Sequence, residues 1–142
     1  MVTDKTAGKE TRLKKVFICS PFRPEGRTDK DKKKDWEQNI ETAQEACGIV
    51  LERGGIPYAP HLYFPQFLSE DNDVERRMGI LLGLTWLAQC DEMWVIGDRV
   101  SEGMKQEIAK AEKWGIPVKR IVRRKTPEER LPAAIFNDIR LV

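Results

Sequence analysis

Four short apolar runs alternate with segments whose apolar residues have helical spacing, and this alternation constrains the fold more than any other feature of the chain. The runs are KKVFIC (14–19), IPYAP (56–60), EMWVIG (92–97) and PVKRIV (117–122). Short continuous apolar runs bounded by charged or turn residues are typical of strands buried on both faces of a parallel sheet. Gly-Ile-Pro occurs twice, where we expect the glycine to end a helix and the proline to open a strand.

The segments between and after these runs are predicted to be helical. The helices are predicted over 35–53, over about 73–89, after Ser101 and after Thr126. Asp35 is the predicted N-cap of the first helix, and the stretch 20–34 before it is predicted as a loop because it contains two prolines, a glycine and a charge run. The second helix is predicted to have one apolar face, formed by Met78, Leu81, Leu82, Thr85 and Trp86.

Alternating strands and helices predict a three-layer α/β fold of the Rossmann/flavodoxin-like class. We expect a mostly parallel sheet of four to five strands in the order 2-1-3-4, within one domain (14–142) that follows a flexible N-terminal tail (1–13). The chain reverses direction between the first and third strands of such a sheet, and ligands bind at that reversal beyond the carboxyl ends of the strands. The loops CSPFRPEG (19–26) and GDRVSEG (97–103) are expected to meet there.

Composition and charge narrow the function classes. The net charge is only +2, so we expect neither a nucleic-acid polymer nor a membrane as partner. The three cysteines, Cys19, Cys47 and Cys90, have no Cys-x-x-Cys spacing and only one histidine accompanies them, so we expect buried free thiols and no metal or other cofactor. The polar N-terminus and the lack of a long apolar run predict a cytoplasmic protein.

The start of the third predicted helix suits an anion or a polar ligand. Ser101 is a natural N-cap, the amides of Glu102, Gly103 and Met104 would face the crevice, and the helix dipole favours negative charge there. Arg23 in the facing loop would add a bidentate clamp. Two simpler interpretations remain open, that Ser101 only caps the helix and that Arg23 is an ordinary exposed arginine.

Two carboxylates are candidates for chemistry at the same crevice. Glu107 lies six residues after Ser101, and its side chain is expected to lean back toward the crevice. Asp98 follows the third strand. The alternatives are a solvated Glu107 paired with Lys110 and an Asp98 that only bonds loop amides. Paired acids of this kind suit glycosyl chemistry, in which one attacks or stabilises the sugar carbon and the other protonates the leaving group.

Aromatic residues gather in the segment HLYFPQF (61–67). His61, Tyr63, Phe64 and Phe67 could stack on a flat base, or they could simply pack on their own domain.

Three segments together resemble the nucleoside 2-deoxyribosyltransferase-like family, which includes the 2'-deoxynucleoside 5'-phosphate N-hydrolases. The segments are VFICSPFR (16–23), GLTWLAQCDEMWVIGD (83–98) and SEGMKQE (101–107). The resemblance implies that Glu107 is the nucleophile and that Asp98 is the acid near the base. It also implies that Arg23, Ser101 and Gly103 hold the 5' end of the nucleoside or nucleotide. We expect Ser20, Phe22, His61 and Met104 to complete the substrate-binding set.

The resemblance further implies a homodimer or higher homo-oligomer, with Asn137 a candidate to complete a neighbouring site. One position departs from the pattern, because Phe17 stands where many members carry a tyrosine that orients the nucleophile. We therefore expect an enzyme acting on the N-glycosidic bond of a small-molecule nucleoside or nucleotide. The alternatives are a non-catalytic nucleotide-binding sensor or sequestering module and, less favoured, a receiver-like signalling domain, which would need paired acids where Ser20 and Pro21 stand.

Overall fold

A four-stranded parallel sheet forms the centre of the protein. The computed structural model describes residues 13–97 and 99–121, and in it the strands lie in the order β2-β1-β3-β4, all parallel. Their bounds are β1 Lys14–Cys19, β2 Gly55–Tyr58, β3 Glu92–Ile96 and β4 Val118–Ile121. The predicted α/β class and strand order are therefore confirmed, and each predicted strand is within two residues of its observed bounds.

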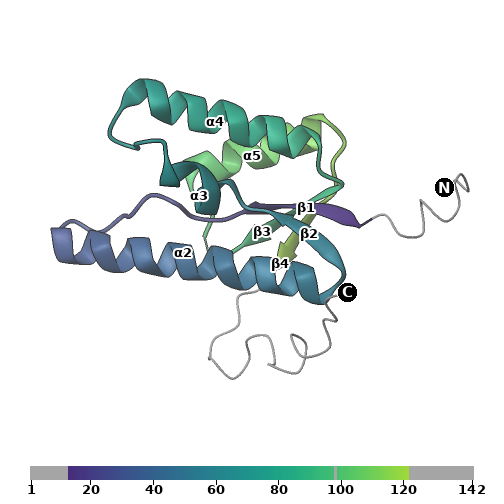
Figure 1. Ribbon diagram of the computed structural model, residues 1–142, viewed down its shortest axis with the longest axis horizontal. Coiled ribbons are helices and arrows are strands. Elements are labelled where there is room, and N and C mark those ends of the chain that lie inside the picture. The colour runs from purple at the N-terminus through teal and green to yellow at the C-terminus, as the bar shows by residue number, and fades with distance from the viewer. Residues whose placement is uncertain (1–12, 98, 122–142) are drawn as a thin grey trace, which may run out of the picture.

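Helices cover both faces of the sheet and make three layers (Figure 1). Helix α2 lies along one face, and helices α4 and α5 cover the other, with the short α3 and η1 segments beside α4. The bounds are α2 Asp29–Glu52, α3 Pro60–Tyr63, η1 Phe64–Gln66, α4 Asp73–Ala88 and α5 Glu102–Lys113. No helix within residues 13–97 and 99–121 combines the length and apolar character needed to cross a bilayer.

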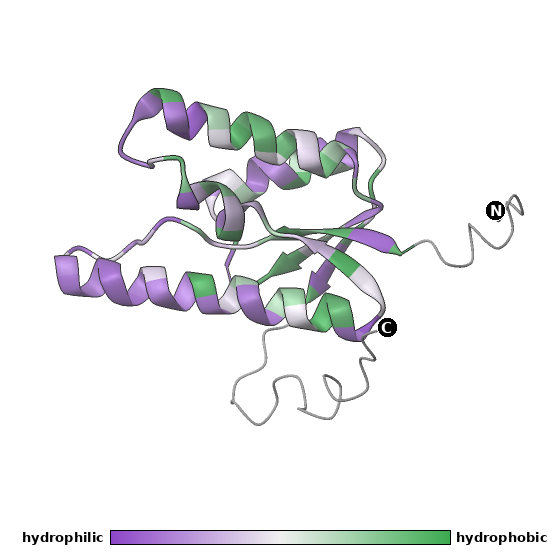
Figure 2. Ribbon diagram, viewed as in Figure 1, coloured by the Kyte–Doolittle hydropathy of each residue, from purple (hydrophilic) through white to green (hydrophobic). Residues whose placement is uncertain are grey.

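The two central strands are apolar on both faces, which explains why their sequences read as continuous apolar runs. Val16 and Ile18 of β1 face α2 in one core cluster, whereas Phe17 and Cys19 of the same strand belong to the cluster beneath α4 and α5. This follows from the strand geometry, which points successive side chains to opposite faces. Figure 2 shows apolar colours on the central strand β3 and polar colours over the amino-terminal part of α2.

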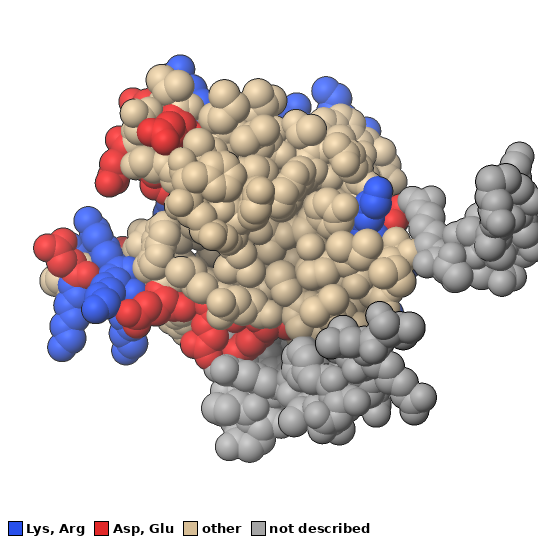
Figure 3. Space-filling model, viewed as in Figure 1, with Lys and Arg blue, Asp and Glu red and all other residues tan. Residues whose placement is uncertain are grey.

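Helix α2 begins earlier than the sequence analysis predicted. It starts at Asp29, and its N-cap is Thr28, whose hydroxyl oxygen accepts a hydrogen bond of 3.1 Å from the Asp31 amide. Asp35 is not the N-cap; its carboxylate accepts the amides of Glu25 and Gly26 and so fastens the preceding loop to the helix. The charge run was misread as a loop signal, although lysine is a good helix former and acidic residues in the first turn suit the dipole. Figure 3 shows basic side chains projecting at the amino-terminal end of α2, where this charge run lies.

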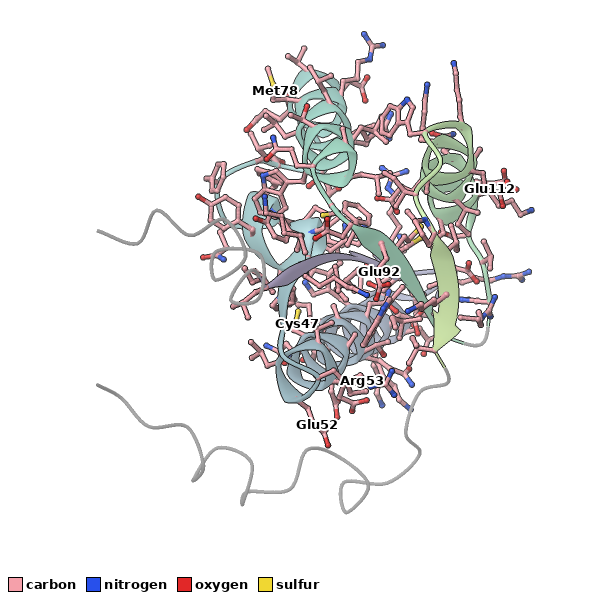
Figure 4. All side chains as sticks on the ribbon, turned by 90° about the vertical axis from the view of Figure 1, so that its right-hand side faces the viewer. Cys47, Glu52, Arg53, Met78, Glu92 and Glu112 are labelled. Atoms are coloured by element: carbon pink, nitrogen blue, oxygen red, sulfur yellow. The ribbon has the colours of Figure 1, made fainter. Side chains whose placement is uncertain are left out.

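The buried face of α4 also differs from the prediction. Gly83 and Leu87 are the buried residues of this helix, whereas Met78 and Leu81 are exposed by 44% and 58%. Figure 4 shows Met78 at the outer edge of the molecule. The predicted stripe failed because α4 is apolar around much of its circumference, so periodicity alone does not identify the side that meets the sheet.

Two further predictions concern residues outside the described ranges. They are the last helix, expected after Thr126, and the N-terminal tail up to residue 12.

Candidate active site

The loops after β1 and β3 meet at the carboxyl end of the sheet. Gly97 directly follows β3 and has a φ of 107°, a conformation that residues with a side chain rarely adopt. A Cβ atom at Gly97 would lie 3.6 Å from Cδ of Pro21, so the two loops are in van der Waals contact. The chain reversal predicted from the strand order is thus closely packed.

Helix α5 begins directly above this contact. The hydroxyl oxygen of Ser101 accepts a hydrogen bond of 3.3 Å from the Met104 amide, and the Ser101 amide donates to Sδ of Met104 at 3.5 Å. Ser101 therefore caps the helix, as predicted. A Cβ atom at Gly103 would meet nothing within 4 Å, so the first turn of α5 is unobstructed on this side.

A cavity of about 820 Å³ lies between the loop after β1, the α3–η1 segment and helices α4 and α5. This volume is within the range of small-molecule pockets. Most of the residues predicted for the site line the cavity, namely Ser20, Phe22, Arg23, His61, Ser101, Gly103, Met104 and Glu107. Asp98 and Asn137 lie outside the described residues.

Glu107 reaches the cavity from the second turn of α5. Its Oε1 atom accepts a hydrogen bond of 3.5 Å from the Cys19 thiol, and Cys19 is the last residue of β1. Burial raises the pKa of Glu107 to about 7, and the thiol hydrogen bond opposes this rise. The ammonium group of Lys110, which the alternative interpretation paired with Glu107, lies 5.9 Å from the Trp114 ring centroid. A carboxyl group with a raised pKa in a cavity marks a candidate functional residue.

Ser20, Phe22 and His61 form one wall of the cavity. Ser20 is fully buried, and its hydroxyl has no hydrogen-bond partner among the described residues. The imidazole of His61 stacks on Phe22, with ring centroids 4.4 Å apart and an angle of 11° between the planes, and Phe22 also contacts Trp36. Burial lowers the pKa of His61 to about 4, against an opposing hydrogen bond with the Ser20 backbone, so the ring is neutral at pH 7.

Charged residues line the outer part of the cavity, and carboxylates outnumber cations there. Arg23 faces Glu70, with 3.7 Å between Nε and Oε2, and its side chain is 60% exposed. Arg23 is therefore paired with a carboxylate. The ionisable lining residues besides His61 are Arg23, Glu25, Glu70, Glu75, Arg76, Glu102, Glu107 and Lys110.

The aromatic segment is divided between the cavity and the domain surface. His61 and Phe64 line the cavity, but Tyr63 and Phe67 do not, and they are exposed by 50% and 57%. The rings of Tyr63, Phe64 and Phe67 contact one another. The interpretation that they pack on their own domain thus describes Tyr63 and Phe67.

Sequence reasoning missed several residues of the site. Cys19 was assigned only as a buried thiol, although its position at the carboxyl end of β1 was a signal that it lies near the crevice. Gly79 and Gly83 also line the cavity, where the absence of side chains leaves room for a ligand. Their spacing of four residues, which puts both on one side of α4, was the signal that could have revealed them.

Comparison with known proteins places this geometry in a family. The family described as "Domain of unknown function (DUF7768)" matches residues 14–121, which include all four strands and the cavity. The chain belongs to this family. A solved structure of a 2-deoxyribosyltransferase from the psychrotolerant bacterium Bacillus psychrosaccharolyticus has a similar fold, with a TM-score of 0.58 and 13% identity over 88% of this chain and 82% of that chain. No match was found among curated proteins.

Proposed function

We propose that this protein is an enzyme that cleaves or exchanges the N-glycosidic bond of a nucleoside or nucleoside 5'-monophosphate, with Glu107 as the nucleophile. The observation that carries the proposal is the placement of the Glu107 carboxyl group, which faces a ligand-sized cavity and is held there by Cys19. The likeness to a 2-deoxyribosyltransferase supports the fold on which this reasoning rests.

The reaction proceeds in two displacements at the anomeric carbon. A Glu107 oxygen attacks C1' of the sugar while the C1'–N bond breaks, and the base leaves with the bonding electrons and takes up a proton. Water or a second base then attacks C1' and releases Glu107 as a carboxylate. Asp98 remains the predicted donor of the proton to the leaving base.

The walls of the cavity suggest how a nucleoside would be oriented. The flat stacked pair of Phe22 and His61 suits a base, because aromatic faces stack on flat rings. The unpaired hydroxyl of Ser20 would gain a hydrogen bond from a polar ligand atom. The open first turn of α5 at Gly103 leaves space for the far end of the sugar.

The charge of the lining favours a free 5'-hydroxyl over a 5'-phosphate. A phosphate that bound Arg23 would have to displace Glu70 and approach the neighbouring carboxylates. We therefore expect the higher kcat/KM with nucleosides. Glu70→Gln should raise kcat/KM for monophosphates by about tenfold, corresponding to about 1.4 kcal/mol, while leaving nucleosides nearly unchanged. An equal effect on both substrate types would contradict this assignment.

Base release measures the proposed function directly. The purified protein is incubated with ribo- and deoxyribonucleosides and their monophosphates, with and without an acceptor base, and products are separated by chromatography. Glu107→Gln should lower base release by about 10⁴-fold or more, because no other group replaces a missing nucleophile. Glu112→Gln is the matched control. Glu112 is exposed on α5, the helix that also carries Glu107, and Figure 4 shows it on the outer side of α5.

Two outcomes would overturn the assignment. Base release that persists in Glu107→Gln would remove Glu107 as the nucleophile. Binding of a nucleotide by the native protein without release of base from any substrate would support the non-catalytic binding module instead.

A further inference from the structure

The carboxyl group of Glu107 is held by an unusual partner. We propose that Cys19 is the positioning residue of the site, and that its thiol donates the hydrogen bond that aims the Glu107 carboxylate at the sugar carbon. This inference rests on the proposed function and identifies a residue that acts through Glu107.

The geometry around Cys19 defines this role. Its side chain is fully buried at the end of β1, and its Sγ atom lies 3.5 Å from Oε1 of Glu107 and 3.8 Å from the carbonyl oxygen of Met104. The thiol has a single proton to donate, and Glu107 is the nearer of its two possible acceptors. Both possible acceptors belong to α5, so either hydrogen bond joins the central strand to the helix that carries the carboxylate. Cys19 is not among the residues that line the cavity. It therefore acts on Glu107 rather than on a ligand.

Strand geometry explains why the partner is this thiol. Phe17 and Cys19 point to the same face of β1, toward α4 and α5, because side chains alternate along a strand. Phe17 has no donor and is fully buried among apolar residues. Cys19, two residues nearer the carboxyl end of the strand, brings a thiol donor to Glu107 instead.

The thiol is suited to donate and not to attack. Burial raises the pKa of Cys19 far above its ordinary value, and the neighbouring Glu107 carboxyl group raises it further. The sulfur therefore stays protonated and is a poor nucleophile. A thiol is a weak donor, which agrees with a Glu107 carboxyl group that keeps a raised pKa despite its hydrogen bond.

Besides Cys19, other ionisable groups near the cavity can influence the pKa of Glu107. Arg120 of β4 acts electrostatically on Cys19. Among the described residues only Cys19 is a hydrogen-bond partner of Glu107. The remaining ionisable groups of the cavity are Arg23, Glu25 and Glu70 from the loops, His61 from α3, Glu75 and Arg76 from α4, and Glu102 and Lys110 from α5.

The first test compares the pH dependence of base release in two variants. Cys19→Ala removes the donor, so kcat should fall about tenfold with little change in KM, and the acid limb of the profile should move up by about one pH unit. Cys19→Ser keeps a donor and should restore most of kcat, with the acid limb at or below its native position. Acid limbs that coincide in all three proteins would overturn the proposal.

Cys90→Ala is the matched control for the loss of a buried thiol. Cys90 is 7% exposed and belongs to the same core cluster, and the charged groups that act on its pKa are Asp91 and Lys15, not Glu107. It should change stability as Cys19→Ala does while leaving the acid limb in place. A shift of equal size in Cys90→Ala would show that the effect of Cys19 is only one of packing.

The second test needs no turnover and so separates this inference from the proposed function. The S–H stretching band of Cys19 is identified in infrared difference spectra by its loss in Cys19→Ala. In the native protein it should shift as Glu107 ionises near pH 7, and the shift should vanish in Glu107→Gln. Base release with a band insensitive to pH would reject Cys19 as the positioning residue. A pH-sensitive band without base release would reject the proposed reaction. The Cys19–Glu107 hydrogen bond would then have no role in catalysis.

Discussion

Glu107 is an acid whose surroundings oppose its charge. Burial raises its pKa to about 7, so roughly half of the molecules carry the carboxylate at neutral pH. Only the ionised form can attack a sugar carbon. We therefore expect kcat/KM for base release to rise as the pH increases through about 7 and then to level off, measured from about pH 5 to about pH 9. A profile that falls over this interval would contradict a carboxylate nucleophile.

The same shift predicts a stability cost. A carboxyl group whose pKa is raised in the folded protein binds its proton more tightly there than in the unfolded chain, so the free energy of unfolding decreases as the pH rises from about 4.5 to about 7. Glu107→Gln removes this titration. We expect the variant to be more stable than the native protein by about 1–3 kcal/mol at pH 8 and by less at pH 5, measured by urea unfolding. Equal differences at both pH values would disprove the shift.

Glu92 is a buried carboxylate with the opposite character. Its side chain is 6% exposed, Trp94 Nε1 donates to it at 2.9 Å, and Lys119 and Lys14 lie 3.0 and 3.4 Å away. Burial alone would raise its pKa, but the Trp94 hydrogen bond and the two lysines outweigh burial and lower the pKa. Figure 4 shows Glu92 at the sheet and Glu112 on the outside of α5.

We expect Glu92→Ala to lower the free energy of unfolding by about 2–4 kcal/mol at pH 7, because it leaves Trp94 Nε1 without its partner. The contribution of Glu92 is present above the ordinary glutamate pKa and should be lost as the pH falls through its lowered value. Denaturant unfolding of Glu112→Ala, an exposed glutamate, provides the reference and should change by less than about 0.5 kcal/mol.

At the scale of the element, α5 carries both a structural cap and the proposed nucleophile. Ser101 caps it through the Met104 amide, so Ser101→Ala should cost about 1 kcal/mol of stability, whereas Ser101→Asp should keep the cap. Thermal unfolding of both variants tests this. If Ser101 also contacts the substrate, Ser101→Asp will raise KM despite its preserved stability, and an unchanged KM would assign Ser101 to capping alone.

Helices α2 and α4 show where element-level prediction failed. The start of α2 depends on competition between a helix and a loop in a charged stretch, and the decisive local event is the hydrogen bond to the Thr28 hydroxyl. The orientation of α4 depends on its contact with α3, where Gly83 lies beside Pro60. Neither is encoded in periodicity, because the start of α2 depends on a capping residue and the orientation of α4 depends on a partner elsewhere in the chain. The strands were predictable because burial on both faces leaves a continuous apolar signal.

At the scale of the molecule, several large apolar side chains of α4 and of the aromatic segment remain exposed. Val74, Met78 and Leu81 lie on α4 with exposures of 71%, 44% and 58%, and Tyr63 and Phe67 are also exposed. A second copy of the chain would cover such a surface with the same surface. We expect light scattering to give a multiple of the 16.4 kDa chain mass, and Leu81→Glu to shift the population toward one chain. A native protein that is monomeric at high concentration would contradict this.

The sequence allowed the site to be located but not its contacts to be resolved. The strand order placed Glu107, Ser101 and Arg23 at one crevice, because parallel strands end at the same edge. It did not indicate that Arg23 faces Glu70 or that Glu107 receives a thiol proton. Both contacts depend on the detailed positions of α5 and of the loop after η1, which the strand order does not determine.

The two ends of strand β1 contact two different carboxyl groups. Lys14 opens β1 beside Glu92, in the ion cluster that stabilises the sheet, and Cys19 closes the same strand beside Glu107. The two carboxylates are thus anchored at opposite ends of one short ladder. Substitutions chosen to improve heat resistance can be confined to the amino-terminal rim, leaving the rim that carries Glu107 untouched. Such a layout would allow stability and the proposed activity to be altered nearly independently.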